Sequence, residues 1–189
     1  MPIDFNLEEL RAEHGCSIYF ETGLYDPSTN VSIKKALASG FEKVFSMEIH
    51  KGFIVMARGA FQNDIRTGRC VLIHDDSTNL NKYLNIDTFK NKTMFFLDAH
   101  VDNNNIQNYK KKCPLFDELE AISSLERKDN VIFIDDLRII KTSFPWGERS
   151  YGDIDFLSQI KARILSINKD YKFKTLNGHV PDDVLMAYI

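Results

Sequence analysis

The chain has 189 residues, the length of one ordinary domain, so a single domain over residues 1–189 with a sizeable core is expected. Its 24 basic and 27 acidic side chains give a net charge of −3, so no overall positive field would draw the protein to nucleic acid or to an anionic membrane. The three cysteines are scattered, with no pair at C-x-x-C spacing, which argues against a disulfide framework or a structural zinc site and favours a reducing compartment.

The N-terminal stretch MPIDFNLEELRAEHG carries acids and lacks the apolar segment of a secretory signal. No later run approaches the roughly 20 apolar residues of a membrane span. We therefore expect a soluble, cytoplasmic protein without a nucleic-acid partner. The sequence would equally suit a domain of a longer polypeptide, and it leaves the oligomeric state open.

Short apolar strands alternate with amphipathic segments, the pattern of a parallel sheet covered by helices on both faces. A first helix is predicted over residues 7–13. Strands are predicted near 17–21, 43–49, 69–74, 93–98 and 131–135, and helices near 32–38, 52–61, 80–83 and 115–125. The tail adds a helix near 154–167 and two strands near 171–175 and 184–189. The predicted fold is α/β and doubly wound, a mostly parallel seven-stranded sheet with an antiparallel last strand, in which the hairpin of the last two strands forms one antiparallel edge.

The first strand runs into a glycine turn, SIYFETG at 17–23. Such a turn at the carboxyl end of a parallel strand is where open α/β sheets bind nucleotide-like ligands. Glu21 would repel a phosphate there, but it suits a cation, an amine or a ribose hydroxyl. Together with acids that end later strands, this feature points to S-adenosylmethionine.

Acids also follow the second and third predicted strands. Glu48 is placed to accept hydrogen bonds from both ribose hydroxyls, as in dinucleotide sites. The third strand ends in HDDS, so Asp76 and Ser77 can reach the adenine amine and ring edge. Each acid alone could be a helix N-cap or a solvated loop acid. Their repeated position after successive strands favours a shared site.

Six blocks in order carry a family resemblance: FETG at 20–23, GFEKVFSMEI at 40–49, DDS at 75–77, FFLDAH at 95–100, CPLFDELEAI at 113–122 and NVIFIDD at 130–136. This series resembles a group of class I S-adenosylmethionine-dependent methyltransferases that are often linked to glycan modification. The resemblance implies a Rossmann-like methyltransferase fold. It also implies that Glu21, Thr22 and Gly23 surround the methionine part, Glu48 holds the ribose, and Asp76 with Ser77 lines the adenine. Relatives usually have a second glycine where this chain reads LYDPST at 24–29.

Three further acids follow the fourth and fifth strands. Asp98, Asp135 and Asp136 should face the same crevice near the methyl donor, and unpaired they would raise one another's pKa. A divalent cation such as Mg²⁺ or Mn²⁺ resolves that repulsion. These three aspartates also look like the metal ligands of the catechol-type O-methyltransferases. Asp98 is in addition predicted to contact the cofactor. The structural alternatives are that Asp135 caps a strand end and that Arg138 pairs with Asp136.

A base must still accept the acceptor's hydroxyl proton. His100 is the preferred candidate, acting together with Asp98, because imidazole titrates near neutral pH. Lys141 is a weaker candidate, since a lysine stays protonated without strong desolvation, and His100 could instead be an ordinary loop histidine. Two polar loops, at 102–113 and 141–153, are expected at the same edge, the second carrying Trp146. The helix near 115–125 is mainly a core helix, with Asp117, Glu118 and Glu120 expected on or near its outer side. Asp117 or Glu118 could nevertheless touch an acceptor hydroxyl.

The sequence therefore predicts an O-methyltransferase that acts on a small hydroxylated molecule or on a sugar within a glycan, with help from a divalent metal. The sugar preference comes from the resemblance alone. One alternative is a methyltransferase-like binding module that has lost activity. Another is a nucleotide-sugar or NAD-dependent enzyme on the same fold, which is disfavoured because the first turn lacks G-x-G-x-x-G.

Overall fold

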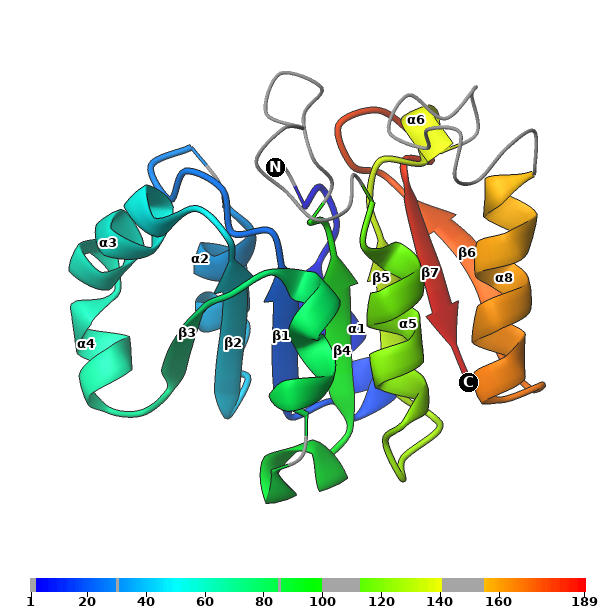
Figure 1. Cartoon of the computed structure of the whole chain (residues 1–189), viewed down its shortest axis with the longest axis horizontal. Coiled ribbons are helices and arrows are strands. Elements are labelled where there is room, and N and C mark those ends of the chain that lie inside the picture. The colour runs from blue at the N-terminus through cyan, green and yellow to red at the C-terminus, as the bar shows by residue number, and fades with distance from the viewer. Residues whose placement is uncertain (1–2, 30, 85, 100–112, 141–154) are drawn as a thin grey trace.

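The computed structural model describes residues 3–29, 31–84, 86–99, 113–140 and 155–189. These residues form one seven-stranded sheet in the order β3-β2-β1-β4-β5-β7-β6 (Figure 1). Its strands are β1 (Ile18–Thr22), β2 (Lys43–Glu48), β3 (Cys70–His74), β4 (Thr93–Leu97), β5 (Val131–Ile134), β6 (Lys172–Leu176) and β7 (Val184–Tyr188). The first five strands pair in parallel, which brings their carboxyl ends to one edge.

The seventh strand runs antiparallel to both of its neighbours, β5 and β6. The last strand is antiparallel and the last two strands form one edge of the sheet, as the sequence predicted; within this pair β7 lies inside and β6 is outermost. The side chains explain this arrangement. Strand β7 reads VLMAY and is almost wholly buried, whereas β6 reads KFKTL and is partly exposed. Lysines on an outer strand also discourage pairing with another chain.

Helices cover both faces of the sheet (Figure 1). One apolar cluster packs α5 (Leu115–Ser123), α8 (Phe156–Ile167) and the 3₁₀ helix η1 (Ser77–Lys82) against the sheet. A second cluster packs α1 (Leu7–His14), α2 (Ser32–Ala38) and α3 (Lys51–Ala60) against the other face. Neighbouring residues of β1 divide between them, Phe20 facing the first cluster and Tyr19 the second. Burial on both faces explains why the central strands are continuous apolar runs.

The short helices differ most from the sequence prediction. The helix predicted over 80–83 is the 3₁₀ helix η1, and a second one, η2 (Asp87–Lys90), follows it. Two further short helices were not predicted, α4 (Gln62–Arg66) and α6 (Leu137–Ile140). Segments of four to six residues are too short for an apolar stripe to repeat, so periodicity does not reveal them.

Two bulk expectations can be compared with the described residues. All three cysteines, Cys16, Cys70 and Cys113, are free and buried, in keeping with the predicted lack of a disulfide framework. Among the described helices, none has both the length and the apolar character needed to span a membrane.

Candidate cofactor site at the carboxyl edge of the sheet

The glycine turn after β1 passes very close to the end of β4. Gly23 has φ +86°, and a Cβ at this position would lie 2.3 Å from the carbonyl oxygen of Asp98. The Gly23 amide donates a hydrogen bond to the Met47 carbonyl (2.9 Å), which ties the same turn to β2. The ends of three neighbouring strands therefore meet at one glycine, and any side chain there would clash with the backbone at the end of β4.

Tyr25 belongs to the stretch LYDPST, where relatives usually have a second glycine, and it adopts the backbone conformation that glycine favours, with φ 56°. Its amide donates to Oε2 of Glu48 (2.8 Å). Its exposed ring packs against Phe53 of α3, with 5.1 Å between ring centroids. The chain thus keeps the left-handed turn without the glycine, and Glu48 and Phe53 hold it in place.

Glu48 ends β2 and is only 8% exposed. Its Oε1 accepts a hydrogen bond from the His50 amide (2.6 Å), while Oε2 accepts the one from Tyr25. Each carboxylate oxygen can accept more than one hydrogen bond, so both can still receive a ribose hydroxyl. The main-chain contacts fix the carboxylate in one orientation beside the glycine turn.

Glu21 lies beneath the turn and is fully buried. Its carboxylate accepts hydrogen bonds from three hydroxyls: Ser32 (2.6 Å), Ser46 (2.6 Å) and Tyr19 (3.2 Å). Burial raises its pKa to about 7, although the three hydroxyls act in the opposite direction. This side chain joins β1, β2 and α2 inside the fold, so it supports the turn from below.

Asp76 and Ser77 follow β3 and start η1. The Asp76 carboxylate caps this helix by accepting the Thr78 amide (2.9 Å), the structural role that the sequence left open for single acids. Ser77 is buried with 7% of its surface exposed. Its hydroxyl lies beside Glu118 of α5 and lowers the pKa of that carboxyl.

Asp98 directly follows β4 and is 8% exposed. Its amide donates to the Thr22 carbonyl (3.0 Å), but its buried Oδ1 has no hydrogen-bond partner among the described residues. Burial, followed by the charges of Asp135 and Asp136, raises its pKa well above the usual range. A buried carboxylate oxygen without a donor is costly, and a cationic or N–H-bearing ligand would relieve that cost.

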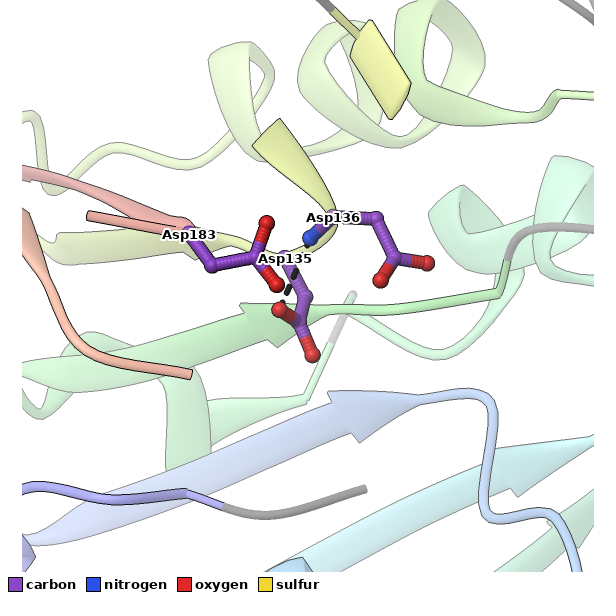
Figure 2. A group of neighbouring side chains, drawn as sticks. All are labelled: Asp135, Asp136 and Asp183. Carbon is purple, nitrogen blue, oxygen red and sulfur yellow. Dashed lines mark hydrogen bonds between the residues drawn. The ribbon is translucent and has the colours of Figure 1, made fainter. Parts of the chain in front are cut away.

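A group of three carboxylates lies at the end of β5 and the start of β7, and it shares Asp135 and Asp136 with the predicted metal-binding set. Asp135, Asp136 and Asp183 each place an oxygen within 4.8 Å of the others (Figure 2). Asp98 lies outside this group but near it, since the charges of Asp135 and Asp136 help to raise its pKa. Burial and the neighbouring Asp136 raise the pKa of Asp135 to about 7.

Asp183 was missed because it follows the turn-rich link before the last strand. Since β7 runs antiparallel to β5, the start of β7 lies beside the end of β5. The predicted antiparallel direction of that strand was the signal that could have identified it.

Arg138 partly neutralises the group. Its Nη1 lies 2.6 Å from Oδ1 of Asp136 and also hydrogen-bonds Asp183, while its amide donates to Oδ1 of Asp183 (2.9 Å). The pairing of Arg138 with Asp136, which the sequence left open, is therefore present. Asp136 also has a positive φ of 63°. The guanidinium thus already supplies one positive charge to these carboxylates.

His100, Lys141, Trp146 and most of the two polar loops lie outside the described residues. Asp98, two residues before His100 in the sequence, lies at the end of β4 beside the glycine turn.

The strand order, with β7 antiparallel between β5 and β6, and a glycine turn after β1 define a Rossmann-like methyltransferase fold. Solved structures agree with this class. The O-methyltransferase TomG from Streptomyces achromogenes, involved in tomaymycin synthesis and solved with S-adenosylmethionine, matches with a TM-score of 0.58 at 15% identity, over 97% of this chain and 77% of its own.

Two further structures show how widely this fold is used. The methyltransferase PaMTH1 of Podospora anserina, solved with S-adenosylhomocysteine, matches with a TM-score of 0.57 at 19% identity, over 96% of this chain and 75% of its own. An rRNA methylase from Streptococcus thermophilus matches with a TM-score of 0.53 at 12% identity, over 100% of this chain and 98% of its own. No protein-family model and no curated protein matches the sequence. At these identities the likeness establishes the fold and leaves the acceptor open.

Proposed function

We propose that this chain is an S-adenosylmethionine-dependent O-methyltransferase. The observation that carries the proposal is the approach of Gly23 to Asp98, because it packs a turn without a side chain against the end of β4, next to a buried carboxylate oxygen that has no hydrogen-bond donor among the described residues. S-Adenosylmethionine suits this pair, since its amino group is a cation and its chain can lie along a turn without side chains. Matching folds solved with this cofactor or its product support the same ligand class.

The residues fit the cofactor as follows. Gly23 and the turn it forms would lie along the methionine part of the cofactor. Asp98 would accept a hydrogen bond from the amino group of that part. Glu48, held by two main-chain amides, would accept the ribose hydroxyls. Asp76 and Ser77 at the start of η1 would border the adenine. When bound, the cofactor supplies an electrophilic methyl group. Glu21 and Thr22 would hold the turn from within the fold.

The proposed acceptor is a hydroxyl group of a sugar, of a glycan or of a small hydroxylated molecule. It would lie over the ends of β4 and β5, where Asp98, Asp135 and Asp136 gather. We include a divalent cation such as Mg²⁺ or Mn²⁺, held by Asp135 and Asp136 with Asp98 or Asp183, because hard oxygen ligands in this number suit these ions. Such an ion lowers the pKa of a bound hydroxyl. Arg138 would have to share or release Asp136 for the ion to bind.

His100 is proposed as the base that takes the hydroxyl proton. In the sequence it follows Asp98 by two residues, and Asp98 lies at the end of β4 beside the glycine turn. A histidine has the right proton affinity near neutral pH. Asp98 would assist it through its negative charge.

The test is calorimetry of the protein with S-adenosylmethionine, S-adenosylhomocysteine and NAD. We expect the protein to bind S-adenosylmethionine and S-adenosylhomocysteine and not to bind NAD. Binding of NAD alone would replace the proposal with a dinucleotide enzyme. Methyl transfer from labelled S-adenosylmethionine to sugars and catechol-like diols then separates an enzyme from a binding module that has lost activity.

A further inference from the structure

Glu118 is an acid with no role in the site described so far. It lies in the first turn of α5 and is completely buried, whereas Glu120 of the same helix is exposed. Neither of its carboxylate oxygens makes a hydrogen bond of normal geometry with the described residues. A buried carboxyl whose hydrogen bonds are poorly formed is costly in a fold. Its position therefore needs a physical reason.

The groups beside Glu118 come from the candidate cofactor site. The hydroxyls of Thr22, at the end of β1, and Ser77, at the start of η1, lie close enough to lower its pKa. Burial is the stronger influence and raises that pKa to about 7, with Asp117 and Asp76 adding to the increase. Glu118 thus lies behind two residues that the sequence assigned to the cofactor.

Ser77 is slightly less buried than Glu118. Glu118 is fully buried, while Ser77 keeps 7% of its surface exposed and directly follows Asp76. An ionised carboxylate can only accept hydrogen bonds, so a serine hydroxyl beside it turns its proton inward. The Ser77 oxygen then presents lone pairs to whatever binds on its outer side. A ligand with an N–H donor is favoured at that point, and a carbonyl oxygen is disfavoured.

We propose that Glu118 is a positioning residue which fixes the direction of the Ser77 hydroxyl, so that the site selects the 6-amino group of adenine over a 6-carbonyl group. The inference rests on the proposed function, since it assumes that adenine lies beside Ser77. It assigns no contact between Glu118 and the ligand. The acid acts through Ser77 alone.

The experiment compares S-adenosylhomocysteine with S-inosylhomocysteine, in which the 6-amino group is replaced by a carbonyl. Calorimetry is done near pH 8.5, at which a group with a pKa of about 7 is ionised. The wild-type protein should prefer the adenosyl compound by roughly tenfold or more, because a polar site rejects a ligand that mismatches its hydrogen bonds. In Glu118→Gln, the amide can donate to Ser77 and let its hydroxyl turn outward. The preference should then fall by about tenfold or more.

Two variants keep the test sharp. Glu120→Gln, on the exposed side of the same helix, should keep the wild-type preference. Ser77→Ala should remove most of the preference, and adding Glu118→Gln to it should change the preference no further, since the two residues act in series. Ser77→Ala also tests the inference without altering Glu118, in case Glu118→Gln does not fold.

The failures can be told apart. A wild-type protein that binds neither compound overturns the proposed function. A wild-type protein that binds both equally, or a Glu118→Gln protein that weakens both by the same factor, overturns this inference and leaves cofactor binding in place. The second result would mean that Glu118 only stabilises the fold.

Discussion

Gly23 and Asp98 approach each other so closely that a Cβ on residue 23 would lie 2.3 Å from the Asp98 carbonyl oxygen and 2.7 Å from its carbonyl carbon. Gly23→Ala must therefore move the β1 turn away from β4, and it must also place a side chain at φ +86°. We expect a loss of stability of more than about 3 kcal/mol, or a folded protein that no longer binds S-adenosylhomocysteine. Urea denaturation and calorimetry measure the two effects.

Gly59→Ala is the matched control. Gly59 lies in α3, and a Cβ there would meet nothing within 4 Å. Alanine is the better helix former, so this variant should gain about 0.5–1 kcal/mol of stability and keep its ligand affinity. If Gly23→Ala behaved like Gly59→Ala, the close approach of the two strand ends would be wrong.

Glu48→Ala should weaken binding of S-adenosylhomocysteine by about 1–3 kcal/mol. The substitution removes the charged acceptor for the ribose and also frees the amides of Tyr25 and His50. Because the Tyr25 turn loses its anchor, some loss of thermal stability should accompany the loss of affinity. Glu42→Gln, an exposed acid just before the other end of β2, should change neither quantity. Unchanged affinity in Glu48→Ala would remove Glu48 from the site.

Stability should fall as the pH rises from about 4.5 to about 7. The pKa of Glu21 is raised in the folded state, so the folded protein keeps a proton that the unfolded chain has already released in this range. The unfolded state then binds fewer protons, and the free energy of unfolding decreases with pH until both states are ionised. Glu118 and Asp135, whose pKa values are also raised to about 7, act in the same direction.

Glu21→Gln isolates the share of Glu21 in this decrease. Urea denaturation at several pH values should show a decrease smaller by on the order of 1–3 kcal/mol than in the wild-type protein. The exposed acid Glu8, replaced by Gln, should leave the pH dependence unaltered. A pH dependence that is the same in Glu21→Gln and the wild type would mean that Glu21 ionises normally in the fold.

The central strands could be read from the sequence because burial on both faces leaves long apolar runs. The second strand, predicted over 43–49, is Lys43–Glu48, and the third, predicted over 69–74, is Cys70–His74. Once the strands were placed, their parallel direction brought Gly23, Glu48 and Asp98 to one edge. This part of the site follows from local pattern and one topological rule.

The remaining features depend on long-range packing. Asp182 and Asp183 are adjacent in the sequence, yet Asp182 is exposed and Asp183 is fully buried beside Arg138, because β7 enters the sheet next to β5. The burial of Glu118, in contrast, could have been predicted from a local pattern. Glu118 lies three residues after Leu115 and four before Ile122, so helical spacing already placed it on the buried face. Its charge suggested an outward side chain instead.

His100→Ala should lower turnover by roughly 10²–10⁴ if His100 is the base, with little change in affinity for S-adenosylhomocysteine. The acidic limb of the pH–rate profile should disappear in the variant, because the group whose ionisation produces it is gone. A small loss of turnover with the same acidic limb in both proteins would show that another group takes the proton.

Divalent metal binding should be sensitive to Arg138, because its guanidinium and the ion require the same carboxylate of Asp136. Arg138→Gln should therefore bind Mn²⁺ several-fold more tightly than the wild type in calorimetry, whereas Asp135→Asn should bind it at least about tenfold more weakly. Asp129→Asn is the control, since Asp129 pairs with Lys92 and Arg127 at the opposite edge of the sheet.

In the wild type, a chelator should stop methyl transfer and spare the binding of S-adenosylhomocysteine. Full activity in excess chelator, with no Mn²⁺ bound by the wild type or by Arg138→Gln, would eliminate the metal and leave Arg138 as the cation that balances these acids.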